Sequence, residues 1–361
     1  MKGIRETSMN YMLENEELEF LKKHEKDLWV EDGLEPIMKM YIGCHYPATI
    51  CNLRCPYCYV GNGVGFHKSP ILEHSPKFVR WCLSQKRLGG RGLLVLCGAG
   101  ETLLGDKIVD VCLELLREGH FLHIVTNGTV GDKMLELTNK AGDMADRLFF
   151  KCSLHYSELK RRNMLDVYSK SINMVSDLGA SYTIEMTTDD AYIDLIDEIK
   201  AFVISEFGAM PHITIARDDS KPDIPILSNL PMDEFYDIWS SFNSELFEVK
   251  WQYYSKPIRN CDAGVHSLYI NLINGSIMRC LKQPTVGNLY DTSVEVLKYE
   301  RVGDNCQLPY CYNNHAYLTL GNCKDIKTYS FAEVRDRKKA NGEHWVKEKV
   351  YKFIGQKLYD N

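Results

Sequence analysis

Three cysteines on one short loop are the residues of this chain best suited to chemistry. Cys51, Cys55 and Cys58 follow the spacing C-x3-C-x2-C, which gathers three thiolates on a few residues of backbone. The common iron–sulfur clusters take four cysteine ligands, so this loop supplies one too few. A [4Fe–4S] cluster held by it would keep one iron open to a small molecule. The spacing therefore predicts chemistry at a cluster and not only storage of an electron.

Zinc and a disulfide are the alternative interpretations of the same loop. A structural zinc site closes its tetrahedron with a fourth Cys or His, and His45 and His67 lie near the loop in sequence. A disulfide fits less well, because the N-terminus lacks the apolar core of a signal peptide. We therefore expect a cytoplasmic protein, in which thirteen cysteines favour metal ligation over disulfides.

An aromatic residue completes the motif. Tyr57 stands directly before the third cysteine, and the pattern C-x3-C-x-aromatic-C resembles the radical S-adenosylmethionine (SAM) superfamily. The resemblance implies that the open iron chelates the amino and carboxylate groups of SAM, with Tyr57 at the cofactor. It also implies that one electron, from a flavodoxin- or ferredoxin-type donor, cleaves SAM to methionine and a 5′-deoxyadenosyl radical, which abstracts a hydrogen atom from a substrate. A protein mainly positions and shields such chemistry.

A small-residue turn follows the second expected strand. Gly98, Ala99 and Gly100 would let the backbone approach a ligand closely, and Glu101 could accept a hydrogen bond from an ammonium group. The turn resembles the G-G-E-P element of the superfamily, which binds the amino group of SAM, with Ala99 and Thr102 as departures. The resemblance thus implies cofactor binding by Gly98, Ala99, Gly100 and Glu101.

Four other polar residues near the ends of expected strands are candidates for the same pocket. Ser153 and His155 stand where relatives place groups near the SAM carboxylate and ribose. Arg217 suits a carboxylate because a guanidinium matches it in fork geometry. We assign Ser153 and Arg217 to the cofactor, and Arg217, His155 and Glu185 as candidate catalytic residues. For each, the alternative is a structurally paired polar residue, and we expect residues 126–128 to be only a strand-end turn.

A second group of cysteines occupies the C-terminal third. Cys261, Gly275 and Cys280 fit C-x13-G-x4-C around an Asn-Gly turn, a strong hairpin signal. This resembles the SPASM or twitch extension of many radical SAM enzymes, followed here by a short helix from Ser293. Only five cysteines are present, too few for two four-cysteine clusters. We expect one auxiliary [4Fe–4S] cluster, which would accept an electron, with zinc as the alternative; its expected ligands are Cys261, Cys280, Cys306 and Cys311, with Cys323 in reserve.

The remaining cysteines are expected to pack as small buried hydrophobic residues; they are Cys44, Cys82, Cys97, Cys112 and Cys152.

The elements that position these residues alternate between strand and helix. Alternation at this spacing indicates βαβ units and a parallel sheet; the fold class is α/β, and six such strands fit the partial (β/α)6 TIM-like barrel of the resembled superfamily. A Rossmann-like sheet is the alternative, but no G-x-G-x-x-G follows the first strand. The cysteine loop follows the first strand, and in parallel barrels the carboxyl ends of the strands carry the chemistry. Strands are expected at 38–43, 92–97, 121–126, 147–154, 181–187 and 212–217, and helices at 75–86, 105–118, 131–141, 157–178, 190–206 and 231–245.

Four units follow from this division. We expect a helical leader at 1–36, the barrel at 37–250, a twitch-like α+β cluster domain at 251–330 and a C-terminal helix within 331–361, spanning 344–359. The net charge of −6 and the absence of a basic aromatic patch argue against a nucleic-acid or membrane partner. No apolar stretch is long enough to cross a membrane.

The expected activity is a net two-electron dehydrogenation of a small molecule such as a sugar, cyclitol or nucleotide sugar. Fifty residues precede Cys51, which leaves little room for the winged-helix peptide-binding domain that many peptide-modifying relatives carry. The alternatives are a maturation enzyme that forms thioether or carbon–carbon crosslinks in a ribosomal peptide, and an epimerase in which Cys97, Cys152 or Cys323 returns a hydrogen atom.

Overall fold

One sheet of nine strands, in the order β6-β5-β4-β3-β2-β1-β7-β8-β9, organises the chain. The computed structural model describes residues 2–29, 33–66, 69–311 and 313–359. The first six strands pair in parallel, each beside the next in sequence, so the predicted α/β fold with a partial barrel is confirmed. They are β1 (Met40–Tyr46), β2 (Gly92–Gly98), β3 (Phe121–Thr126), β4 (Leu148–Ser153), β5 (Ser181–Thr187) and β6 (His212–Thr214).

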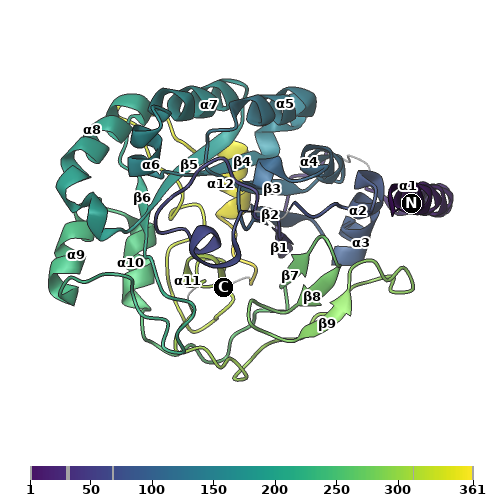
Figure 1. The fold of residues 1–361 in the computed structure, drawn as a ribbon. Helices are drawn as coiled ribbons and strands as arrows, with labels where there is room; N and C mark the ends of the chain where they lie inside the picture. Colours follow the sequence, from purple (N-terminus) through teal and green to yellow (C-terminus); the bar gives the residue numbers. More distant parts are fainter. Residues whose placement is uncertain (1, 30–32, 67–68, 312, 360–361) are drawn as a thin grey trace.

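Helices cover the outer face of this curved sheet (Figure 1). Alternate strand residues such as Ile42, Leu94 and Phe150 point outward and are buried against apolar helix residues. Ser75 and Ser244 cap α2 and α10 by accepting hydrogen bonds from backbone N–H groups of the first turn. The helices of the barrel are α2 (Pro76–Cys82), α3 (Gln85–Leu88), α4 (Ile108–Arg117), α5 (Gly131–Ala141), α6 (Tyr156–Arg161), α7 (Leu165–Asp177), α8 (Ile196–Phe207), α9 (Met232–Ser240) and α10 (Glu245–Gln252).

The end of the chain returns to the inner face of the sheet. Phe121 and Phe149, which point inward, pack against residues 331–354 in a second core. Phe121 stacks on Phe353 of α12 (Glu348–Ile354) with ring centroids 3.8 Å apart, and Figure 1 shows the yellow α12 within the curve of the strands. The C-terminal segment thus closes the inside of the half-barrel.

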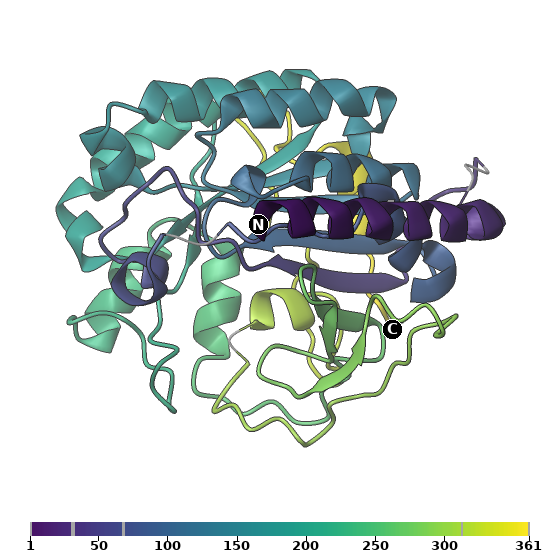
Figure 2. The ribbon, with the colours of Figure 1, turned by 45° about the vertical axis from the view of Figure 1, so that its right-hand side comes forward.

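The predicted hairpin extends the same sheet. β7 (Ser267–Asn271) pairs in parallel with β1, and β8 (Ser276–Met278) pairs back on β7 across a turn in which Gly275 has φ 73°. A third strand that was not expected, β9 (Thr285–Asn288), pairs with β8. Figure 2 shows these green strands beside the dark-blue β1. The predicted boundary at residue 250 falls within α10, and the strands before and after it belong to one sheet.

Several helix predictions need correction. The helix at 75–86 is divided into α2 and α3, and the helix at 231–245 ends with α9 at Ser240. The helix at 157–178 is divided at Asn163, whose φ of 55° breaks it into α6 and α7. No helix begins at Ser293, because the Asp291 carboxylate accepts from the Ser293 amide and hydroxyl and forms a turn. The C-terminal helix spans only α12, since Trp345 is buried before it with its indole N–H donating to the Phe207 carbonyl.

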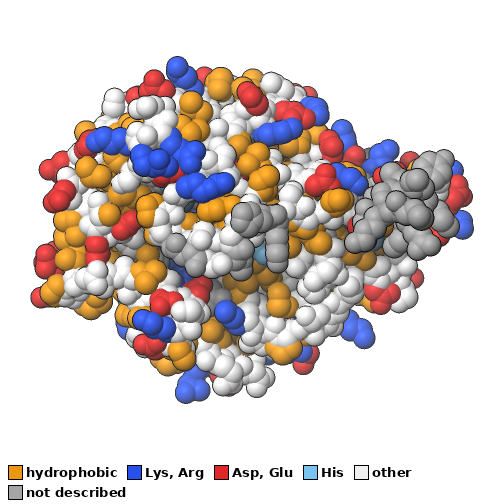
Figure 3. Space-filling view, in the orientation of Figure 1, with side chains coloured by type: hydrophobic (Ala, Val, Ile, Leu, Met, Phe, Trp, Pro, Cys, Tyr) orange, Lys and Arg blue, Asp and Glu red, His pale blue; other side chains and the backbone are white. Residues whose placement is uncertain are grey.

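The N-terminal segment is helical as expected, with α1 (Lys2–His24) and a 3-10 turn (Glu25–Asp27). None of the described helices combines the length and the apolar character that a membrane span requires. The face seen in Figure 3 carries both basic and acidic side chains among hydrophobic ones.

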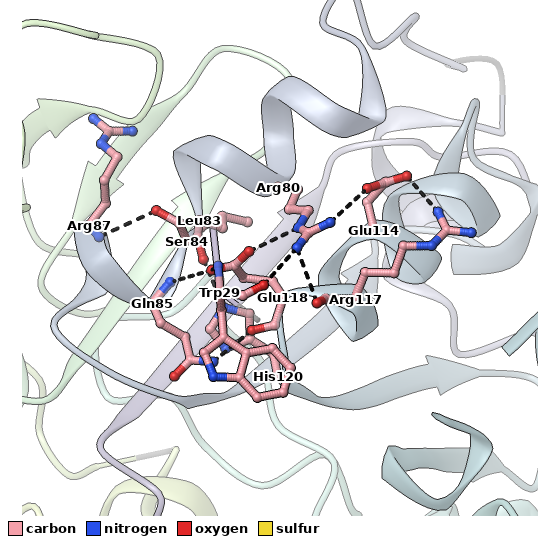
Figure 4. Close-up of polar contacts among 10 residues, drawn as sticks. All are labelled: Trp29, Arg80, Leu83, Ser84, Gln85, Arg87, Glu114, Arg117, Glu118 and His120. Carbon is pink, nitrogen blue, oxygen red and sulfur yellow. Dashed lines mark hydrogen bonds and ion pairs between the residues drawn. The ribbon is translucent and has the colours of Figure 1, made fainter. Parts of the chain in front are cut away.

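A buried ion pair fixes the N-terminal segment to α2 and α4. Glu118 is fully buried, and its carboxylate accepts from Arg80 Nε at 2.9 Å and from the backbone amides of Trp29 and Gln85 at 3.1 Å (Figure 4). Arg80 also donates to the Trp29 carbonyl at 3.2 Å. Burial raises the pKa of Glu118, while these donors oppose that rise. The carboxylate therefore links three segments at once.

Glu118→Ala should lower the free energy of unfolding by about 3 kcal/mol or more, because it removes the nearest carboxylate of the Arg80 charge and leaves two buried amides without their acceptor. Urea denaturation measures the change. Glu136→Ala is the matched control: it removes an exposed partner of Lys133 and Lys140 and should cost much less. Equal losses in the two variants would contradict the role of Glu118.

Candidate functional site

The cysteine loop leaves the carboxyl end of β1 and turns sharply. The Cys58 amide donates to the Cys55 carbonyl at 3.1 Å, and Arg54 Nη1 donates to the Cys51 carbonyl at 2.6 Å. Burial raises the pKa of Cys51, and burial together with Cys58 and Glu158 raises that of Cys55 to about 12. Deprotonating these neighbouring thiols without a metal is thus unfavourable. Bound iron would offset that cost, since metals bind the thiolate form. The donor set therefore fits an iron–sulfur cluster.

The alternative to a cluster is a site for a single metal ion such as zinc. Among the described residues, no three Cys, His, Asp or Glu side chains are close enough to share one metal ion. His45 lies on the inner face of β1, with Nδ1 3.2 Å from the Cys97 carbonyl and its ring stacked on Tyr269. His67 lies outside the described residues.

The predicted small-residue turn is in direct contact with the cysteine loop. The Gly100 amide donates to the Ala48 carbonyl at 2.7 Å, and the Glu101 amide donates to the Ile50 carbonyl at 2.8 Å. A Cβ on Gly100 would lie only 2.2 Å from the Ile50 oxygen, so only glycine fits. The turn from Gly98 through Ala99 to Glu101 thus continues the β1–β2 pairing and fixes the start of the loop.

The Glu101 carboxylate joins the ends of two strands. It is 2% exposed and accepts from Thr126 Oγ1 at 2.8 Å, the Asn127 amide at 2.7 Å and the Leu103 amide at 3.1 Å. Burial raises its pKa, and these three donors work against that rise. A carboxylate has about four acceptor positions, so one remains for a ligand. Its contact with the SAM amino group stays a prediction.

Asn127 holds the cysteine loop from the side. Its Nδ2 donates to Asn52 Oδ1 at 2.8 Å and lies 3.7 Å from Cys51 Sγ, while its Oδ1 accepts from Thr129. The sequence-based interpretation of residues 126–128 as a plain turn missed this role. The available signal was the position of this polar residue. Asn127 follows the carboxyl end of β3 just as Glu101 follows the carboxyl end of β2.

Tyr57 points from the loop toward β4. Its hydroxyl lies 2.6 Å from His155 Nδ1 and 3.2 Å from the Tyr192 hydroxyl. Burial, aided by Lys151, lowers the pKa of His155 to about 4, and burial raises that of Tyr57. A protonated phenol therefore lies against a neutral imidazole. His155 and Tyr57, both predicted site residues, are brought together.

The inner faces of β4 and β5 carry a charged cluster. Glu185 Oε1 lies 2.6 Å from Arg335 Nη1, and its Oε2 lies 3.4 Å from Lys151 Nζ, which also donates to Ser153 Oγ at 3.3 Å. Burial opposes ionisation of Glu185, but Arg335 and Lys151 outweigh it and lower its pKa. Glu185 is therefore an ionised structural partner in this structure. Arg217, at the end of β6, pairs through Nε with Asp219 at 2.8 Å.

All five C-terminal cysteines contact one small apolar cluster, in which Cys261 and Cys323 are buried and the other three are partly buried. The neighbouring Cys323 thiol lowers the pKa of Cys261. Burial raises the pKa of Cys280 to about 12, with Cys261 and Cys306 beside it, and Cys311 neighbours the same three. The reserve ligand Cys323 thus lies as centrally as the four preferred ones. Which four bind a cluster stays a prediction.

The other cysteines divide into two groups. Cys97 differs from the expectation, because it lies on the inner face of β2 and is partly exposed beside Lys151. The other four are buried in the outer core as predicted; they are Cys44, Cys82, Cys112 and Cys152.

Gly100→Ala should reduce the iron bound after reconstitution, because the added Cβ must displace the Ile50 carbonyl that fixes the loop. We also expect about 1–3 kcal/mol lower unfolding free energy, as for overpacking elsewhere. Iron analysis and urea denaturation measure both effects. Gly63→Ala is the matched control on the same loop, since no atom lies within 4 Å of its added Cβ. Full iron in Gly100→Ala would contradict the constraint.

Comparisons with solved structures return several distant likenesses. Streptococcus suis SuiB is 14% identical, with 78% of this chain and 68% of that chain covered at a TM-score of 0.48. Native anSMEcpe with bound AdoMet and a Kp18Cys peptide is 13% identical, with 71% and 79% covered at 0.44. TYW1 with a lysine-pyruvate adduct is 14% identical, with 55% and 70% covered at 0.38.

Comparison with curated protein sequences gives no match. A family model described as the Radical SAM superfamily matches residues 46–152, which run from the end of β1 through β4 and include the cysteine loop, the Gly98–Glu101 turn and Asn127. This family implies a [4Fe–4S] cluster that works with SAM. Residues 46–152 of the chain are therefore a radical SAM domain.

Proposed function

We propose that the chain cleaves SAM reductively at a [4Fe–4S] cluster held by Cys51, Cys55 and Cys58, and oxidises a small molecule. Bound there, the cluster and SAM would supply a 5′-deoxyadenosyl radical that removes a hydrogen atom from the substrate. One observation carries the proposal: a three-thiol loop in the matched domain is fixed by backbone bonds to the Gly98–Glu101 turn at the strand ends.

The chain's own residues prepare this site. Glu101 and Asn127 hold the loop against β2 and β3 through buried hydrogen bonds. Tyr57 is hydrogen-bonded to His155 and so closes the side toward β4. The C-terminal segment packs against the inner face of the sheet where β2, β3 and β4 begin, and it keeps water from that end of the half-barrel. The loop is thus positioned before any cofactor arrives.

An auxiliary [4Fe–4S] cluster forms the second half of the proposal. The cluster of five cysteines supports it, because four protein thiolates complete a cluster with no open iron. Our preferred ligands remain Cys261, Cys280, Cys306 and Cys311. Such a cluster would take the second electron of a dehydrogenation. The first electron would come from a flavodoxin- or ferredoxin-type donor.

Epimerisation is a second candidate, favoured by Cys97. Its thiol lies on the inner face of the sheet and is partly exposed, so it is placed to return a hydrogen atom. Cys152 faces the outer core and is not so placed. Deuterium incorporation from heavy water into the product would distinguish epimerisation from dehydrogenation.

Anaerobic reconstitution should give about eight irons per chain, the sum of two [4Fe–4S] clusters. Cys58→Ala should lose about four irons and all formation of 5′-deoxyadenosine from SAM with dithionite. Cys280→Ala should also lose about four irons but still release 5′-deoxyadenosine.

Cys82→Ala is the control, because this cysteine is buried in the outer core; it should keep full iron and full SAM cleavage. Wild-type protein that binds iron yet releases no 5′-deoxyadenosine would overturn the proposed function. Full iron in Cys280→Ala would overturn the auxiliary cluster alone.

A further inference from the structure

A buried lysine without a hydrogen-bond acceptor among the described residues lies on α10. Lys250, on α10, is 6% exposed, and none of the described residues accepts a hydrogen bond from its ammonium group. A buried charge is costly unless it is paired. A lysine kept in this position therefore points to a partner that binds from outside the chain.

The charges around Lys250 indicate the sign of that partner. Arg217, Arg335 and Lys151 all act on it as like charges, and Glu185 opposes them. Arg217 is itself paired with Asp219 at 2.8 Å. That carboxylate is already shared between Arg335 and Lys151. Burial, with Arg217 and Arg335, lowers the pKa of Lys250 well below its ordinary value. An anion beside Lys250 would reduce the repulsion among these cations and would accept a hydrogen bond from the ammonium group.

A small pocket gives access to this lysine. Its volume is about 20 Å³, somewhat more than the ~10–15 Å³ that one water needs, so it admits a single oxygen atom of a larger ligand. Tyr254 and Tyr310 form an aromatic wall with ring centroids 5.0 Å apart. Tyr310 Oη donates to the Ile224 carbonyl at 2.6 Å, which fixes the wall. The lining is Ile215, Arg217, Lys250, Tyr254, Tyr310 and Asn314.

The pocket lies after β6 and beside the C-terminal cysteines, which favours a substrate over SAM as its ligand. Arg217 and Ile215 follow β6, whereas the three N-terminal cysteines follow β1, and Asn127 after β3 holds their loop. The same loop reaches toward β4 and β5 through Tyr57. Tyr310 directly precedes Cys311 of the C-terminal cysteine cluster.

We propose that Lys250 and Arg217 bind an oxyanion of the substrate, a carboxylate or a phosphate, and that the substrate is therefore anionic. That the bound anion belongs to a substrate rests on the proposed function, whereas the anion site itself can be tested alone. In this proposal Arg217 contacts the substrate and not the SAM carboxylate.

Equilibrium dialysis of the reconstituted protein tests the site, with saturating SAM present so that the SAM carboxylate occupies its own position. Radiolabelled inorganic phosphate and radiolabelled acetate are separate arms that distinguish the two oxyanions. We expect saturable binding of at least one probe at one per chain, weakened at least about 30-fold in Lys250→Met. Lys86→Met, an exposed lysine paired with Asp27, should bind as the wild type does.

Thermal unfolding without either anion provides a second measurement. Lys250→Met should melt at or above the wild-type temperature, because it replaces an unpaired buried cation by an apolar side chain of similar size. A lower melting temperature would show a structural role for Lys250 and overturn the site.

Absence of saturable binding in the wild type, or binding that survives in Lys250→Met, would also overturn the site. So would binding that appears only when SAM is omitted, since the pocket would then belong to SAM. Release of 5′-deoxyadenosine by the wild type is scored separately, so failure of the proposed function and failure of the anion site remain distinguishable.

Discussion

The close approach of Gly100 to the Ile50 carbonyl is the constraint on which the rest of the site depends. At this contact the β1–β2 pairing continues past the end of the strands, and the backbone amides of the turn bond to the carbonyls that precede Cys51. The first cysteine therefore takes its position from the sheet and not from the rest of its own loop. A side chain at residue 100 would separate the two segments.

Buried polar groups extend this constraint across the mouth of the half-barrel. Glu101 ties the turn to β3, and Asn127 carries the connection on to Asn52 and Cys51. Further round the inner face, Lys151, Glu185 and Arg335 join β4 and β5 to the C-terminal segment. Such charges inside a protein cost free energy unless they are paired, and the pairing leaves Lys250 as the cation without a hydrogen-bond acceptor among the described residues. The proposed anion site follows from this imbalance.

The strands and the cysteine loop were predictable because their signals are local. Residues 121–126 are mostly apolar and residues 181–187 alternate polar and apolar side chains, and the structure has β3 and β5 at those positions. The helix divided at Asn163 and the shortened C-terminal helix were predicted wrongly, since one depends on a single left-handed residue and the other on the burial of Trp345. Lys250 and Arg335 could not be placed from sequence at all. They reach the inner face through α10 and the returning C-terminal segment, and that path is set by tertiary packing.

The central claim is that the iron held by Cys51, Cys55 and Cys58 has one open coordination site for SAM. Electron paramagnetic resonance of the dithionite-reduced double variant Cys261→Ala/Cys280→Ala tests it most directly, because this variant should keep only the N-terminal cluster. The account predicts a [4Fe–4S] signal whose spectrum changes when SAM is added. A signal from this variant that SAM leaves unchanged would contradict it.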